Sequence, residues 1–171
     1  DDAGLMVSLI QSIYVKFGSG LVPDGMGFAF QSRGSAFSLD AEHPNAYAPG
    51  KRPFHTIIPA FVSKNGAPWL SFGVMGGSMQ PQGHVQVILN MVEFGMDPQE
   101  AIDAARFRHD SGTTVAVERL DVDVTAGLEA LGHELCDPDG VGFGGAQAIL
   151  KLAQGWAAAS DPRKDGIAAG H

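Results

Sequence analysis

Two adjacent glycines, Gly76 and Gly77, separate an apolar run from a helix pattern in the stretch GVMGGSMQPQGHVQ (73–86). Glycine leaves its backbone N–H group unshielded, and such donors can stabilise the oxyanion of an acyl-transfer intermediate. A helix that starts beside them adds a favourable dipole if its N-terminus points the same way. The pair also fits a tight turn that needs a positive φ. The stretch is neither GxGxxG nor a P-loop, so a phosphate cradle is not predicted.

The histidines and the cysteine lack the spacing of a metal site. The chain has 6 His and 1 Cys, and it contains neither HExxH nor CxxC. We therefore predict no metal and no cofactor. His84 lies at the start of the predicted helix, where a local hydrogen bond is more typical than a substrate contact.

The composition indicates a globular protein. The chain has 171 residues, of which 44% are hydrophobic and 18% charged, which suits one domain with a buried core. Its formal net charge is -8 and no basic stripe is present, so we predict no nucleic-acid partner. No apolar run approaches the roughly 18 residues that a membrane span requires.

Strand patterns occupy much of the chain. Asn65-Gly66 lies between two apolar runs, which predicts a hairpin over 57–75. A glycine-rich loop is expected over 17–27, and an irregular passage over 34–53. The remaining predicted strands are 5–15, 28–32, 114–118, HELC (133–136), AQAILKL (146–152) and GWAAAS (155–160).

Two neighbouring helices are predicted after the hairpin. The first has apolar residues at i, i+3, i+4 and i+7 on one face, namely Val85, Ile88, Leu89 and Val92. The second begins in the stretch 97–100, where Asp is the N-cap, Pro the first helical residue and Glu the third.

A third, short helix is predicted over 123–131. Val124, Leu128 and Leu131 are expected to face inward, and Gly132 to end the helix. Strands, two adjacent helices, a strand, a helix and further strands then follow one another. This order predicts an α+β fold with antiparallel pairing rather than alternating βαβ units.

Six short motifs occur in order along nearly the whole chain. They are FGSG (17–20), NAYAPGKRP (45–53), GVMGGS (73–78), QVILNMVEFGMDPQEAIDAARFRH (86–109), GGAQAI (144–149) and ASDPRKDG (159–166). Together they resemble the small subunit of γ-glutamyltransferases, also called glutathione hydrolases, which are N-terminal nucleophile hydrolases.

The resemblance implies a four-layer α-β-β-α sandwich, of which residues 1–171 form the small-subunit part as a single domain. In that family the proenzyme cleaves itself into a large and a small subunit. The new N-terminal threonine is the nucleophile, and its α-amine is the base. Gly76 and Gly77 match the oxyanion-hole glycines. The implied partners are the large subunit and a small amide substrate, and a homo-oligomer of heterodimers is compatible with the resemblance.

The chain departs from the family pattern at its beginning. The family's small subunit opens with the threonine and a first strand, and by this resemblance both lie upstream of Asp1. We therefore expect a chain that lacks the first strand and is inactive alone. The alternative is a non-catalytic relative that acts as a binding or scaffold subunit. We favour truncation, because starting inside a hairpin exposes a sheet edge.

A second departure concerns the groups that recognise the glutamyl ammonium and carboxylate. Ala36 occupies the position of the family's amine-binding Asp, and a buried ammonium without that carboxylate is poorly compensated. His55 and Thr56 replace two consecutive serines that bind the carboxylate. Both replacements can still donate hydrogen bonds.

Three further positions complete the implied acyl pocket. Ser12 matches a threonine near the nucleophile, Tyr14 matches an asparagine, and Arg33 falls where a substrate-contacting glutamine usually lies. An arginine can bind a carboxylate bidentately. These changes resemble a divergent branch that includes oxamate amidohydrolase and glutaryl-cephalosporin acylases. The expected substrate is therefore an amide with a carboxylate-bearing acyl group.

Overall fold

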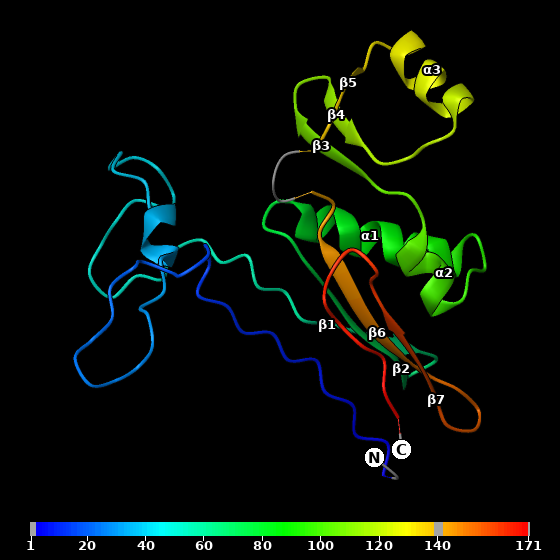
Figure 1. Ribbon diagram of the computed structural model, residues 1–171, viewed down its shortest axis with the longest axis horizontal. Coiled ribbons are helices and arrows are strands. Elements are labelled where there is room, and N and C mark those ends of the chain that lie inside the picture. The colour runs from blue at the N-terminus through cyan, green and yellow to red at the C-terminus, as the bar shows by residue number, and fades with distance from the viewer. Residues whose placement is uncertain (1–2, 139–141, 171) are drawn as a thin grey trace. The chain divides into compact units, whose positions relative to one another are not determined.

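The computed structural model describes residues 3–138 and 142–170, which fall into two compact units (Figure 1). Unit 1 comprises the residues up to Leu9 and those from Ile58 onward, and unit 2 comprises Ile10–Ile57. The named strands and α-helices all belong to unit 1, where they form a mixed α+β fold. The predicted α+β class is confirmed.

A four-stranded antiparallel sheet with the order β1-β2-β6-β7 is the centre of unit 1. The predicted hairpin is confirmed, because Asn65 (φ +55°) and Gly66 (φ +79°) form the left-handed turn between its two strands. The four strands are β1 (Ala60–Lys64), β2 (Ala67–Met75), β6 (Gly145–Lys151) and β7 (Trp156–Ser160).

Helices α1 (Met79–Val92) and α2 (Pro98–Asp103) pack on this sheet (Figure 1). The predicted start of α2 is confirmed, since the Asp97 carboxylate accepts from the N–H groups of Gln99 and Glu100 and completes a capping box. Apolar side chains of both helices and the sheet form one core, including Leu70, Phe72, Val74, Val87, Met91, Ile102 and Ala146.

A second sheet of unit 1 has the order β3-β4-β5. Its strands are β3 (Phe107–Ser111), β4 (Thr114–Val117) and β5 (Glu134–Cys136). Pairing is antiparallel between β3 and β4 but parallel between β4 and β5, so the prediction of antiparallel pairing is wrong there. Helix α3 (Val122–Ala130) connects β4 to β5, and such a crossover brings the second strand back parallel. The residues predicted to face inward on α3 are not buried.

Two predicted strands are absent. Residues 4–9 form no regular element, and along them Met6 and Ser8 are half-buried while Leu5, Val7 and Leu9 are exposed. The Ser8 hydroxyl donates to the carbonyl of Phe72 at 3.2 Å, yet 5–15 contains no strand because no strand of either sheet pairs with it. Residues 28–32 form no strand either, although the Phe30 N–H donates to the Leu21 carbonyl at 2.8 Å.

Unit 2 is built mainly from turns. It contains one 3₁₀ turn, η1 (Arg33–Ala36), and an isolated bridge between Ser38 and Ala46. The irregular passage predicted over 34–53 is thus confirmed outside that turn. Among the described helices of the chain, none is long and apolar enough to cross a membrane.

Candidate functional site

The glycine pair forms a left-handed turn between β2 and α1. Gly76 is buried and has a φ of +133°, and Gly77 has a φ of +57°. The Gly76 carbonyl accepts from the Met79 N–H at 3.0 Å, so the turn leads directly into the helix. Both conformations are ones that side chains rarely adopt, which explains why glycine occupies both positions.

The GGAQAI motif packs against this turn. A Cβ added at Gly76 would lie 2.8 Å from the Cα of Gly144. A Cβ at Gly144, whose φ is +73°, would lie 2.2 Å from the carbonyl oxygen of Met75. The end of β2 and the residue before β6 therefore approach more closely than any side chain allows.

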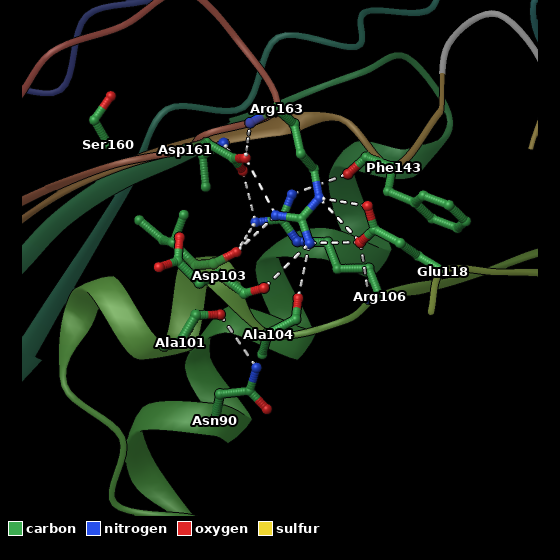
Figure 2. A network of polar contacts seen from close by, with 12 residues as sticks. Asn90, Ala101, Asp103, Ala104, Arg106, Glu118, Phe143, Ser160, Asp161 and Arg163 are labelled. Atoms are coloured by element: carbon green, nitrogen blue, oxygen red, sulfur yellow. Dashed lines mark hydrogen bonds and ion pairs between the residues drawn. The ribbon is translucent and has the colours of Figure 1, made fainter. Parts of the chain in front are cut away.

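A buried ionic network braces the chain beside Gly144 (Figure 2). Asp161 and Arg106 are each only 1% exposed, and their ion pair measures 2.8 Å between Oδ2 and Nη2. Asp161 also accepts from the Ala146 N–H at 2.8 Å, while Arg106 Nη1 donates to the Phe143 carbonyl at 3.0 Å. These two contacts flank Gly144 and hold its loop against the glycine turn.

Arg163 extends the network toward β4 (Figure 2). Its Nη1 lies 3.2 Å from Asp161 Oδ1 and donates to the Ile102 carbonyl at 2.8 Å. Its Nε donates to both carboxylate oxygens of Glu118 at 3.0 Å. The arginine thus links the end of β7, the end of α2 and the end of β4. Asp161 and Arg163, two residues apart in the ASDPRKDG motif, thus form an ion pair that joins these three elements.

The network lowers the pKa of both carboxyl groups. Burial alone would raise the pKa of Asp161, but the N–H groups of Arg163 and Ala146 and the charges of Arg106 and Arg163 outweigh it. Burial would likewise raise the pKa of Glu118, and the hydrogen bonds and charge of Arg163 outweigh that effect. Both groups are therefore ionised in the folded protein at neutral pH.

Polar side chains of α1 make local contacts. His84 Nδ1 lies 2.6 Å from the Gln80 carbonyl, so Nδ1 carries the proton, and its ring contacts the Phe72 ring at a tilt of 52°, with 5.0 Å between the ring centres. The local hydrogen bond expected for His84 is thus present.

Two glutamines of α1 close the outer edge of β3. The Gln82 amide donates to the His109 carbonyl at 3.0 Å and accepts from the His109 N–H at 2.8 Å. Gln86 repeats this pattern on Phe107, at 2.8 and 3.1 Å. The i, i+4 spacing of the glutamines matches the two-residue spacing of outward N–H groups on a strand edge. We call the hydrogen bonds of these two side chains to β3 the glutamine clamp. Sequence reasoning missed both β3 and the glutamine clamp.

In unit 2 the structure brings three of the predicted site residues together. Arg33 is buried, with 4% exposed, and its Nη1 donates to the hydroxyl of Thr56 at 3.0 Å. The guanidinium carbon lies 5.3 Å from the centre of the Tyr14 ring, a cation–π contact. No carboxylate among the described residues forms an ion pair with Arg33.

The other predicted residues of unit 2 lie around this group. The Ser12 hydroxyl accepts from the Tyr14 N–H at 2.9 Å, which stabilises a turn at Tyr14 (φ +80°). Ala36 ends the 3₁₀ turn that begins at Arg33. His55 is exposed, and its Nδ1 accepts from the Ile57 N–H at 3.2 Å, so the proton of the neutral ring is on Nε2.

The predicted site residues are thus divided between the two units. Gly76 and Gly77 belong to unit 1, and Ser12, Tyr14, Arg33, Ala36, His55 and Thr56 belong to unit 2. Among the residues that the structure describes, no three His, Cys, Asp or Glu side chains are grouped so that they could hold a metal ion.

The chain is similar to proenzymes of known activity. It is 39% identical over 180 residues to the oxamate amidohydrolase proenzyme of Klebsiella pneumoniae, covering 100% of this chain and 34% of that protein. It is 30% identical over 185 residues to the glutathione hydrolase proenzyme of Escherichia coli, again covering 100% of this chain but 32% of the relative. The chain therefore spans about a third of the length of these curated relatives.

Solved structures share the fold along the whole chain. The γ-glutamyltranspeptidase of Pseudomonas nitroreducens superposes with a TM-score of 0.92 at 30% identity, covering 100% of this chain and 96% of the matched chain. The cephalosporin acylase of Bacillus halodurans superposes with a TM-score of 0.88 at 47% identity, covering 95% of this chain and 32% of the matched chain. The family model described as Gamma-glutamyltranspeptidase matches residues 1–171. The chain, with the fold of an N-terminal nucleophile hydrolase, therefore belongs to the gamma-glutamyltranspeptidase family.

Proposed function

We propose that this chain is the small-subunit part of a proenzyme that hydrolyses or transfers an amide-linked acyl group bearing a carboxylate. The observation that carries this proposal is the left-handed Gly76-Gly77 turn at the β2–α1 junction, in a chain that matches the family over its whole length. The complete enzyme is a four-layer α-β-β-α sandwich to which a large subunit and the first strand contribute.

The reaction proceeds through an acyl-enzyme. A threonine outside this chain, at the N-terminus of the mature small subunit, attacks the amide carbon with its hydroxyl oxygen. Its α-amine takes the hydroxyl proton and passes it to the leaving nitrogen as the C–N bond breaks. Water or an amine acceptor then gives a proton to the α-amine and attacks the ester carbon, the C–O bond to the threonine breaks, and the α-amine returns the proton to the threonine hydroxyl. Gly76 and Gly77 hold the tetrahedral oxyanion through their N–H groups, an effect of about 3 kcal/mol per donor in other hydrolases.

Arg33 binds the carboxylate of the acyl group. Its guanidinium is already desolvated and positioned by Thr56 and Tyr14, and no described carboxylate of the chain pairs with it. A buried cation is strongly stabilised by a ligand carboxylate. Thr56 and His55 add hydrogen-bonding groups, and Ser12 holds the turn at Tyr14.

Ala36 affects a second feature of the substrate, namely whether the acyl group carries an α-amine. A methyl group cannot compensate the ammonium of a glutamyl substrate, so the pocket favours acyl groups with a carboxylate and no α-amine. Oxamate has that chemistry, and the 39% identical Klebsiella relative is an oxamate amidohydrolase. Glutaryl amides share it.

The test uses the full-length polypeptide that contains this chain. Intact masses and N-terminal sequencing are expected to show a small subunit that starts with threonine upstream of Asp1 and a larger companion. Ammonia release from oxamate and from glutaryl amides should exceed cleavage of a γ-glutamyl anilide. A product without an N-terminal threonine and without amide cleavage would refute the proposal in favour of the non-catalytic scaffold.

Arg33→Met probes the acyl pocket directly. Losing a hydrogen-bonded charge pair of about 1.5–3 kcal/mol should lower kcat/KM for carboxylate-bearing substrates by about 10- to 150-fold. Arg52, an exposed arginine of the same unit, provides the matched control, and Arg52→Met should leave kcat/KM unchanged. Equal kcat/KM values for the Arg33 and Arg52 variants would mean that Arg33 does not bind the carboxylate of the acyl group.

A further inference from the structure

The glutamine clamp fixes the register of β3 on α1. Gln82 donates to the His109 carbonyl and accepts from the His109 N–H, and Gln86 does the same at Phe107. Each side chain therefore satisfies both outward backbone groups of one strand residue, as a neighbouring antiparallel strand would. A slip of β3 by one residue would turn these groups toward β4, so the clamp determines which residues of β3 lie beside each turn of α1.

This register places two buried arginines beside the chain that leads into β6. Arg106 precedes β3, and Arg108 lies within it, between the two clamped residues. Arg106 Nη1 donates to the Phe143 carbonyl (Figure 2), and Arg108 Nη1 donates to the Gly142 carbonyl, each at 3.0 Å. Arg106 is also held by its ion pair with Asp161, so the register of β3 matters most for Arg108.

Gly144 follows these two carbonyls and packs against the glycine turn from which α1 begins. A Cβ at Gly76 would lie 2.8 Å from the Cα of Gly144, so a shift of one backbone segment toward the other displaces it. The Gly76 carbonyl accepts from the Met79 N–H at 3.0 Å, and Gln82 lies in the turn of α1 that follows. A closed ring of contacts thus runs along α1 to the glutamine clamp, through β3 and its arginines, and back to the glycine turn.

We propose that Gln82 and Gln86 are positioning residues for amide cleavage, because the glutamine clamp holds the glycine turn whose N–H groups bind the oxyanion. This inference rests on the proposed function. The two side chains act on the turn only through the ring of contacts. Oxyanion donors stabilise charge that develops in the transition state, so a displaced turn lowers kcat and leaves KM unchanged. A displacement of about 1 Å can cost about 100-fold in rate.

The double variant Gln82→Leu with Gln86→Leu tests the proposal in the full-length protein. It removes the hydrogen bonds of the clamp and keeps side chains of similar size. Gln154→Leu, at an exposed position between β6 and β7, is the control for an added apolar side chain. In the double variant kcat should fall about 10- to 100-fold while KM stays within about twofold, and the control should change neither.

Two further measurements separate positioning from a loss of folded protein. Rates are divided by the concentration of folded enzyme, measured by calorimetry on the same sample. A boronic acid that carries a carboxylate forms a tetrahedral adduct with the nucleophile, and its inhibition constant should rise by the factor by which kcat falls. The single variant Gln82→Leu, which lies nearer the glycine turn than Gln86, should show a smaller effect of the same kind.

Hydrogen exchange reports on the turn itself. The Met79 amide bonds to the Gly76 carbonyl, so its exchange should speed up at least about fivefold in the double variant. The Ala148 amide at the centre of β6 is the reference and should exchange at its original rate. Unchanged exchange at Met79 would show that the glutamine clamp does not hold the turn.

Two kinetic results would also overturn the proposal. An unchanged kcat in the double variant, or a fall in kcat/KM that comes from KM alone, would show that catalysis does not depend on the clamp. In either case an original protein that cleaves amides keeps the proposed function. An original protein that cleaves no amide instead refutes the proposed function, and with it the catalytic role of the clamp, so the two failures are distinguished.

Discussion

Asp161→Asn is the most informative perturbation of the buried network. The substitution keeps the size of the side chain and removes its charge. In the folded protein the carboxylate accepts from the N–H groups of Ala146 and Arg163 and pairs with the guanidinium groups of Arg106 and Arg163. An amide can replace one acceptor oxygen, but its NH₂ group then faces donors that it cannot satisfy.

The expected cost follows from the burial of Arg106. That side chain is 1% exposed, and Asp161 is the carboxylate with which it pairs. Removing one member of a buried pair leaves an uncompensated charge and typically costs about 3–5 kcal/mol. For a domain of this size, about 2–4 °C of Tm accompanies each kcal/mol, so Tm should fall by roughly 6–20 °C.

Calorimetric unfolding of the purified protein measures this loss. Asp165→Asn is the matched control, because Asp165 is exposed in the same loop and its substitution should cost less than about 0.5 kcal/mol. The double variant Asp161→Asn with Arg106→Met should recover part of the loss, because it removes the orphaned cation. If Asp161→Asn and Asp165→Asn unfold within about 1 °C of each other, the network does not support the fold and our reasoning about it is refuted.

Three further outcomes can be checked. The network holds the pKa values of Asp161 and Glu118 below their ordinary range. The stability that these carboxylates provide is therefore fully present above their unfolded-state pKa of about 4 and is lost as pH falls through the lower folded-state values. Urea titrations below about pH 5 should show the free energy of unfolding falling with pH, and Asp161→Asn should make that dependence weaker. Gly76→Ala should impair folding or abolish amide cleavage, because its Cβ would lie 2.8 Å from Gly144 Cα. Gly66→Ala is the control and should cost only about 1 kcal/mol of stability, because its Cβ would meet nothing within 4 Å. Expression yield and Tm distinguish the two variants, and equal tolerance would contradict the close packing at Gly76. Gln86→Leu removes hydrogen bonds worth about 1–3 kcal/mol and should speed hydrogen exchange at the Phe107 amide by about 5- to 150-fold. The Val115 amide of β4 is the reference. Unchanged exchange at Phe107 would show that Gln86 does not protect the edge of β3.

Local signals in the sequence predicted several elements correctly. The Asn65-Gly66 turn and the Asp97 capping box depend on backbone conformations and hydrogen bonds within a few residues. Gly132, which follows α3, also has the expected positive φ of +91°. Such features form the same way in many tertiary contexts, so sequence alone was sufficient for them.

Strands depend on partners that a sequence does not reveal. The apolar run 5–15 has a strand composition, yet neither sheet pairs with it. The opposite holds for β3, which forms a strand although its charged sequence FRHDS has little strand character. It becomes a strand because β4 pairs with one edge and the glutamines of α1 satisfy the other.

The candidate site likewise combines features that the sequence determines with features that only the tertiary structure determines. The sequence alone determined that glycines 76 and 77 lie at a strand-to-helix junction, and the ordered motifs selected the residues of the acyl pocket. Only the tertiary structure decided that Arg33 is buried against Thr56, 23 residues away, and that Arg106 pairs with Asp161. It also decided which apolar face of α1 enters the core. Periodicity reveals a helical face but not its neighbours, because burial depends on contacts between segments that are distant in the sequence.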